Sequence, residues 1–209
     1  MNKFIRNKKI LVIFPIVIVL LVLSIFIIKD KMIPKLKLVT TTSVISYDSN
    51  EEIRVQAVLT DLPDNIYPAA NVSIEFDKDK LELVDFTIGT MKVYDDYDEA
   101  SDDEPKFKIP QWTYNLDMAN EQGIINAMYL DTTVGKNAYS KDGFKKGKND
   151  IPFQLIFKLK KSVIADEKLE IKINEAMFAT VTGSEDKSTL STKDNYGKLN
   201  TENLIIKTK

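Results

Sequence analysis

The sequence predicts an all-β fold: a two-sheet, antiparallel β-sandwich of about nine strands, preceded by one transmembrane helix at the N-terminus. Three observations predict it. Short segments in which apolar and polar residues alternate recur along residues 36–209, and alternation with a period of two is typical of half-buried strands. Turn-forming residues separate these segments. No segment of this region shows the period of an amphipathic helix. A jelly roll is one arrangement of such a sandwich.

The clearest segment is Ala70–Gly89, which we interpret as two strands joined by a turn. The first strand has one apolar face, formed by Val72, Ile74 and Phe76. The polar residues Asp77–Lys80 form the turn. In the second strand the alternation changes phase, so we expect a β-bulge near Leu83–Val84 that keeps the apolar side chains on the core face. These core side chains are Leu81, Leu83, Val84, Phe86 and Ile88.

The N-terminus contains a segment of membrane-spanning length. Residues 10–28 carry no charge and lie between lysine-rich flanks. About 19 residues form a helix of roughly 28 Å, close to the thickness of a bilayer core. We interpret the segment as an uncleaved signal anchor, because it is longer than a secretory h-region and lacks a small-residue cleavage pattern. A cleaved signal peptide is the alternative.

The anchor divides the chain into two parts. Residues 1–35 form the basic N-terminus, the anchor and a connector. Residues 36–209 form the folded domain, which we expect to be extracytoplasmic, with the N-terminus inside.

The remaining strands follow the same pattern along the domain. Residues 53–59 and 153–159 alternate strictly. Trp112, Tyr114 and Leu116 share one face of another expected strand, which favours a core position for this tryptophan. A short extra strand is possible at residues 176–181. In chain order, the expected strands are 38–46, 53–59, 71–76, 81–88, 111–116, 123–131, 153–159, 169–173 and 199–207.

Two residue types, cysteine and histidine, are absent from the sequence. Their absence excludes cysteine nucleophiles, Ser-His-Asp triads and zinc sites with thiolate or imidazole ligands. The 29 basic and 31 acidic residues nearly balance, so nothing indicates the basic stripe of a nucleic-acid-binding protein. Paired carboxylates can hydrolyse glycosides, but the many acidic residues on expected loops and exposed faces favour solvated side chains. We therefore expect a binding protein rather than an enzyme, with no cofactor and no metal site.

An acidic stretch, residues 91–110, interrupts the strands and is expected to be a long exposed loop. Its carboxylates would suit calcium, but it lacks the spacing of an EF-hand, so we interpret the loop as solvated. Aromatic residues suggest an alternative function, a carbohydrate-binding module at the cell surface. The aromatic residues that could stack on sugar rings are Trp112, Tyr94, Tyr97 and Tyr139.

The order of these segments resembles that of the cohesin family. The resemblance covers most of residues 38–207. It rests on the order and spacing of four short pieces, because each piece alone is common in alternating strands. These pieces are Asp61-Leu62-Pro63, Phe76-Asp77, Leu81-Glu82-Leu83-Val84 and Phe157-Lys158-Leu159-Lys160.

The resemblance implies a nine-stranded jelly roll that is not catalytic and that holds dockerin modules. Dockerins carry EF-hand-like calcium loops, so calcium would belong to the partner. By holding dockerins, cohesins recruit polysaccharide-degrading enzymes, so a polysaccharide is a possible further partner. In this family the dockerin binds one sheet, formed by the third, fifth, sixth and eighth strands. Carried onto this sequence, the outward positions of those strands are Asn71, Ser73, Glu75, Thr113, Asn115, Asn126, Met128, Glu170 and Lys172.

Overall fold

The computed structural model describes residues 33–63, 65–90, 93–95, 106–108, 111–131, 138–140, 151–180 and 188–209. Pro34–Lys209 form one compact unit. The expected membrane span, residues 10–28, lies outside the described residues. Among the helices that are described, none combines the length and the apolar character needed to cross a membrane.

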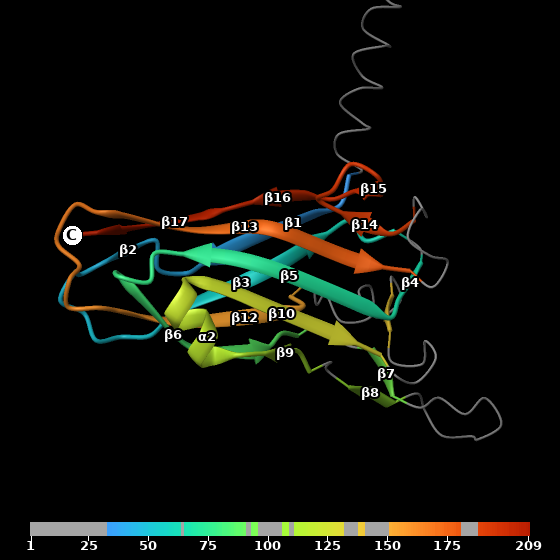
Figure 1. Ribbon diagram of the computed structural model, residues 1–209, viewed down its shortest axis with the longest axis horizontal. Helices are drawn as coiled ribbons and strands as arrows, with labels where there is room; N and C mark the ends of the chain where they lie inside the picture. Colours follow the sequence, from blue (N-terminus) through green and yellow to red (C-terminus); the bar gives the residue numbers. More distant parts are fainter. Residues whose placement is uncertain are drawn as a thin grey trace, which may run out of the picture. The chain divides into compact units, whose positions relative to one another are not determined.

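One layer of the unit is a five-stranded sheet (Figure 1). Its neighbouring strands run antiparallel, except for the parallel pair β16 and β1. The strict alternation of β3 explains its central place, because every second side chain is buried against the other layer. In order across the sheet, the strands are β16 (Asn200–Glu202), β1 (Lys35–Thr40), β3 (Ile53–Thr60), β12 (Phe153–Leu159) and β6 (Leu81–Ile88).

The second layer is an eight-stranded sheet. Its long strands run antiparallel, whereas β14 with β15 and β17 with β2 are parallel pairs. Beside β13 lie β17 (Leu204–Thr208) and then β2 (Val44–Ile45). The main order is β15 (Gly197–Lys198), β14 (Leu190–Ser191), β13 (Lys168–Ala179), β5 (Ala69–Phe76), β10 (Ile124–Leu130) and β9 (Thr113–Tyr114).

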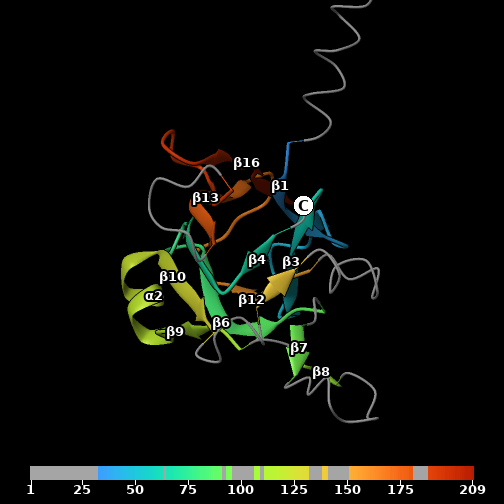
Figure 2. The same cartoon turned by 90° about the vertical axis from the view of Figure 1, so that its right-hand side faces the viewer.

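Side chains from both sheets pack between them into one core. Seen from the end (Figure 2), β13 and β10 lie on one side and β1 and β3 on the other. Val72, Ile74 and Phe76 of β5 are at most 4% exposed. The rings of Phe76 and Phe157 meet edge to face, with centroids 5.2 Å apart. Burial of each such side chain contributes about 1.5–3 kcal/mol. The predicted β-sandwich is confirmed, but its sheets are mixed rather than wholly antiparallel, and very short strands add to the expected number.

The stretch Ala70–Gly89 supplies one strand to each sheet, β5 to the larger and β6 to the smaller. The turn between them is held locally. The Asp77 carbonyl accepts from the Leu81 N–H at 2.8 Å, and the Asp77 side chain accepts from the Asp79 N–H at 2.9 Å. Short polar side chains that bond the backbone two residues on are typical of tight turns. Because β5 and β6 belong to different sheets, they do not pair with each other, and the turn connects one sheet to the other.

The expected β-bulge is present in β6. The register of this strand against β12 shifts between Leu83 and Asp85, so Val84 is the extra residue. The shift returns Phe86 to the core, where it is 5% exposed. Two expected core positions are wrong. Val84 is only half-buried because it is the bulged residue, and Ile88 is 42% exposed at the end of the strand.

The strand expected at residues 111–116 is shorter in the structure, and a helix follows it. Here β9 covers only Thr113–Tyr114, and the helix α2 (Leu116–Gln122) follows directly. The expectation of a domain without helices is therefore wrong. The reason is that α2 has only seven residues and buries only Ala119 fully, so its apolar stripe is too short to produce a helical period.

Other strand boundaries in the structure also differ from those expected from the sequence. The strand expected at residues 38–46 is divided into β1 and β2, which lie in different sheets. The ends of the acidic stretch form a two-stranded hairpin, β7 (Val93–Asp95) with β8 (Lys106–Lys108), so the expectation of a continuous loop is wrong. The rest of that stretch lies outside the described residues. A second small sheet pairs β11 (Tyr139–Ser140) with β4 (Ile66–Tyr67).

Candidate partner-binding face

Four strands of the larger sheet lie side by side in the order β13, β5, β10 and β9 (Figure 1). Successive side chains of a strand point to opposite faces of its sheet. In β10, Ile125, Ala127 and Tyr129 are buried, so the residues between them point away from the core. We call the surface formed by these outward residues the outer face. It comprises Asn71, Ser73, Glu75, Thr113, Ile124, Asn126, Met128, Leu130, Glu170, Lys172, Glu175 and Met177.

The strand register places the uncharged site residues next to one another. Asn126 lies opposite Ser73, and Met128 lies opposite Asn71. On its other side, Met128 pairs with Thr113 of β9. Residues paired across neighbouring strands have Cβ atoms about 4.5–5.5 Å apart, so these five side chains form one patch. The burial of Ile125, Ala127 and Tyr129 places Asn126 and Met128 of β10 outward, as the sequence predicts.

Strand β13 adds the charged site residues. Lys172 lies opposite Glu75 of β5, and Glu170 lies opposite Ile205 of β17. The structure therefore brings every site residue expected from the sequence onto the outer face except Asn115. Their role in binding stays a prediction.

Asn115 has a local structural role instead. Its Oδ1 accepts a hydrogen bond from the Met118 N–H at 3.0 Å, which makes Asn115 the N-cap of α2. The same helix ends at Gly123, whose φ of 73° places it in the left-handed region. The position expected for Asn115, on the outward face of a strand, is wrong because the strand ends one residue earlier.

The sequence prediction misses Glu175 and Met177 because it ends the strand at residue 173. In the structure β13 continues, and its register against β5 shifts between Ile173 and Glu175, which leaves Asn174 as an extra residue. Such a bulge reverses which residues face outward. A signal for it exists in the sequence, because the apolar phase changes between Ile173 and Ala176, and both residues are buried.

One end of the outer face is apolar. Met128 is 50% exposed and Leu130 is 59% exposed. Met177 is half-buried and lies across Asn71 from Met128. Exposed apolar side chains that gather in one place mark interaction surfaces, and methionine adapts its shape to a partner.

The other end of the outer face carries carboxylates that neighbouring amides orient. Asn174 Nδ2 donates to Glu75 Oε2 at 3.0 Å, and Asn203 Nδ2 donates to Glu170 Oε1 at 3.0 Å. A hollow of about 480 Å³ lies beside Glu75, Glu170 and Lys172. Within the described part of the chain, Lys172 forms no hydrogen bond or ion pair through its ammonium group. This end thus presents fixed carboxylates and an available ammonium group.

The aromatic side chains considered for sugar stacking do not form a surface. Trp112 is 8% exposed, and its Nε1 donates to Tyr139 Oη at 3.0 Å. Tyr139 is fully buried, and this burial raises the pKa of its hydroxyl well above 10.0. The expected core position of Trp112 is confirmed, and a sugar platform on Tyr139 is excluded. The side chains of Tyr94 and Tyr97 lie outside the described residues.

No protein-family model and no curated protein matches the sequence. Solved structures do match. The third cohesin of ScaC from Acetivibrio cellulolyticus, in complex with the ScaB dockerin, is 15% identical to this chain. The match has a TM-score of 0.57 and covers 84% of this chain and 99% of that one. The seventh ScaB type I cohesin from Pseudobacteroides cellulosolvens is 13% identical, with a TM-score of 0.53, over 85% of this chain and 92% of that one.

A further match is the sixth cohesin of scaffoldin B from Acetivibrio cellulolyticus, in complex with a Cel5 dockerin. It is 16% identical, with a TM-score of 0.55, over 85% of this chain and 99% of that one. At such identities the likeness is one of fold. It spans nearly all of each cohesin, and the matched proteins belong to the family that the short sequence pieces resemble. This chain has the fold of a cohesin module.

Proposed function

We propose that this chain is a cohesin-like binding module that holds a dockerin-type protein module on its outer face. The observation that carries the proposal is the continuous outer face itself, because it lies on the strands to which the family resemblance assigns the partner. Cohesins that share this fold form complexes with dockerins, as in ScaC and scaffoldin B of Acetivibrio cellulolyticus.

The composition of the outer face supports a protein partner. Met128 and Leu130 offer apolar contact area at one end of the outer face, and polar residues such as Ser73 and Asn126 lie next to it. Protein interfaces combine apolar contact area with polar groups. The charged end combines carboxylates with one lysine, Lys172, whereas a nucleic-acid partner would require a predominantly basic surface.

The partner that fits the proposal best is a dockerin on a polysaccharide-degrading enzyme. Calcium would then be carried by the dockerin rather than by this chain. The module would bind and position the enzyme, and it would reach polysaccharide through that enzyme, without a reaction of its own.

We further propose that residues 10–28 anchor the chain in a membrane, with the N-terminus inside and residues 36–209 extracytoplasmic. The uncharged length of this segment and the missing cleavage pattern support the anchor. The mass of the mature chain tests it, because a loss of about 28 residues would mean a cleaved signal peptide. Protease added to intact cells should digest the folded domain, and protection of that domain would contradict the topology.

Binding can be tested with the full chain in detergent against a panel of purified dockerins in the presence of calcium. Replacing Asn71, Ser73 and Glu75 together with alanine should weaken binding at least tenfold, which corresponds to about 1.4 kcal/mol. The control replaces Arg54 and Glu82, two exposed residues on strands of the smaller sheet, and it should bind normally.

Three results would contradict the proposal. Unchanged binding by the triple variant would mean that the outer face is the wrong surface. Binding that persists in EDTA would exclude a calcium-loaded dockerin. Failure to bind any dockerin of the panel would exclude the partner class.

A further inference from the structure

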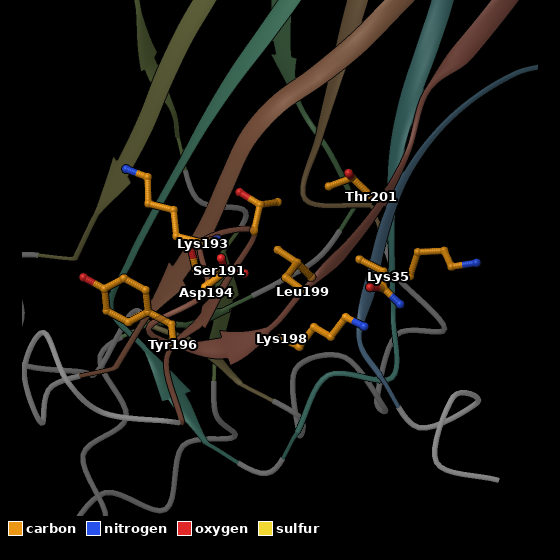
Figure 3. A pocket seen from close by; sticks show the side chains of 10 residues that line it. Lys35, Ser191, Lys193, Asp194, Tyr196, Lys198, Leu199 and Thr201 are labelled. Carbon is orange, nitrogen blue, oxygen red and sulfur yellow. Dashed lines mark hydrogen bonds between the residues drawn. The ribbon is translucent and has the colours of Figure 1, made fainter. Parts of the chain in front are cut away.

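The two edges of the sandwich are closed differently. At one edge α2 packs against β6 and β10. At the other edge the chain crosses from β15 in the larger sheet to β16 in the smaller sheet through the buried Leu199. A pocket of about 590 Å³ opens at this crossing (Figure 3). Its volume lies within the range of about 300–1,000 Å³ that is typical of small-molecule sites.

The lining of this pocket is polar and rich in hydrogen-bond donors. Leu199 is its only aliphatic side chain, and hydroxyl, amide and ammonium groups form most of the rest. The charged side chains of the lining are three lysines, Lys35, Lys193 and Lys198, and one carboxylate, that of Asp194. A lining of this kind suits a ligand that carries hydroxyl groups and negative charge, because an apolar ligand would leave these donors without acceptors.

The three lysines are not equivalent. Lys193 Nζ lies 2.8 Å from Glu175 Oε1, and this hydrogen bond raises the pKa of the Lys193 ammonium group. Lys35 Nζ lies 3.6 Å from Glu202 Oε2. Lys198 forms no hydrogen bond or ion pair through its ammonium group within the described residues. Among the lysines that line this pocket, Lys198 is therefore the one whose charge is not paired with a carboxylate of the described residues.

The side chains that line the pocket lie in two groups, one on each side of Leu199. Figure 3 shows Lys198 extending towards the strand that carries Lys35, whereas Lys193 and Tyr196 lie on the other side. Tyr196 is partly exposed. Its ring offers an apolar face and its hydroxyl a polar tip, which is the combination that the two faces of a sugar ring require. The side with Tyr196 can thus contact a sugar ring, and the side with Lys198 can contact a charged group of the same polymer.

We propose that this pocket binds an anionic polysaccharide, with one sugar ring against Tyr196 and a carboxylate or phosphate group of the same polymer at Lys198. Asp194 then accepts hydrogen bonds from sugar hydroxyls. The site lets the module bind a charged polymer directly, through side chains other than those of the outer face, and so goes beyond the function proposed above.

Calorimetric titration of the full chain in detergent tests this site with three probes. Trigalacturonate supplies carboxylates, glucose 6-phosphate supplies a phosphate, and cellotriose is neutral. At least one anionic probe should bind at least tenfold more tightly than cellotriose, and the preferred anion identifies the kind of polymer. Lys198→Gln should weaken binding of that anion about fivefold, as for an exposed ion pair. The matched control is Lys161→Gln, in an exposed turn outside the pocket.

Equal binding of cellotriose and the anionic probes would overturn the proposal. So would equal affinities of the Lys198→Gln and Lys161→Gln variants, or no binding of any probe. Dockerin binding by Lys198→Gln is measured in parallel and should be unchanged, because Lys198 lies outside the outer face. A failure of the sugar site can thus be distinguished from a failure of the protein-binding face.

Discussion

Asn120 of α2 completes the edge of strand β6 by bonding both polar backbone groups of Leu83. Asn120 Nδ2 donates to the Leu83 carbonyl at 2.8 Å, and the Leu83 N–H donates to Asn120 Oδ1 at 2.8 Å. The side-chain amide takes the place of a further strand at an edge that would otherwise be open to pairing with another chain. Because α2 also packs against β10, this contact links the smaller sheet to the strand that carries Asn126 and Met128.

Asn120→Asp tests the contribution of this contact to stability. The carboxylate can still accept from the Leu83 N–H but cannot donate to the carbonyl, which then loses its partner. We expect a loss of about 1–3 kcal/mol in the free energy of unfolding, measured with urea. Gln122→Ala on the exposed side of the same helix is the control and should change stability by less than about 0.5 kcal/mol. Equal stability of Asn120→Asp and the wild type would show that the contact contributes nothing.

Much of the sandwich could be predicted because alternation directly reports which side chains are buried. In β3, Ile53, Val55 and Leu59 are all at most 1% exposed, as the period of two indicates. The role of Asn120 could not be predicted in this way. A polar side chain that bonds a distant backbone leaves no period in the sequence, and the same holds for the capping residue Asn115.

The outer face was predictable only as far as strand register allowed. Asn126 and Ser73 were expected on one surface, and the structure pairs them. The bulge at Asn174 and the outward position of Met177 were missed although the apolar phase changes between Ile173 and Ala176. A change of phase alone does not determine how strands that are distant in sequence pair with each other. The pocket beside Leu199 was also missed, because it joins Lys35 to residues near the opposite end of the chain.

The buried pair of Trp112 and Tyr139 provides a second test of stability. Tyr139→Phe removes the acceptor of the indole N–H, and a buried donor without a partner costs about 1–3 kcal/mol. We expect this loss in the free energy of unfolding, followed by tryptophan fluorescence. In a Trp112→Phe background, measured by circular dichroism, the same change should cost less because no donor is left unpaired. Equal costs in the two backgrounds would mean that the pair is not energetically coupled.

Asn115 distinguishes helix capping from partner binding. Asn115→Ala removes the N-cap of α2 and should lower the free energy of unfolding by about 1 kcal/mol, whereas Asn115→Ser should largely preserve it. Affinity for a dockerin should stay unchanged at a temperature at which both variants are folded. If Asn115→Ala lost as much affinity as the triple variant of Asn71, Ser73 and Glu75, we would conclude that Asn115 contributes to dockerin binding.

The ion pair of Lys80 and Glu167 predicts a specific response of stability to pH. Lys80 Nζ donates to Glu167 Oε1 at 2.8 Å, and the Ile164 N–H donates to Glu167 Oε2 at 3.0 Å. The bond from Lys80, followed by that from Ile164, lowers the pKa of Glu167 below 4.5. The folded protein therefore keeps this carboxylate ionised at a pH where the unfolded chain protonates it. The resulting stabilisation is present above the unfolded pKa and is lost as pH falls through the folded pKa.

Glu167→Gln removes the charge while keeping the shape of the side chain. The melting temperature of the variant should lie below that of the wild type at about pH 6, and the gap should close as the pH falls through the folded pKa of Glu167, where the wild-type carboxylate becomes protonated. Glu82→Gln, at an exposed position of β6, is the matched control and should show only a small gap over the same range of pH. A gap for Glu167→Gln that does not change with pH would mean that hydrogen-bond geometry, rather than the charge of Glu167, joins the turn after β5 to the segment before β13.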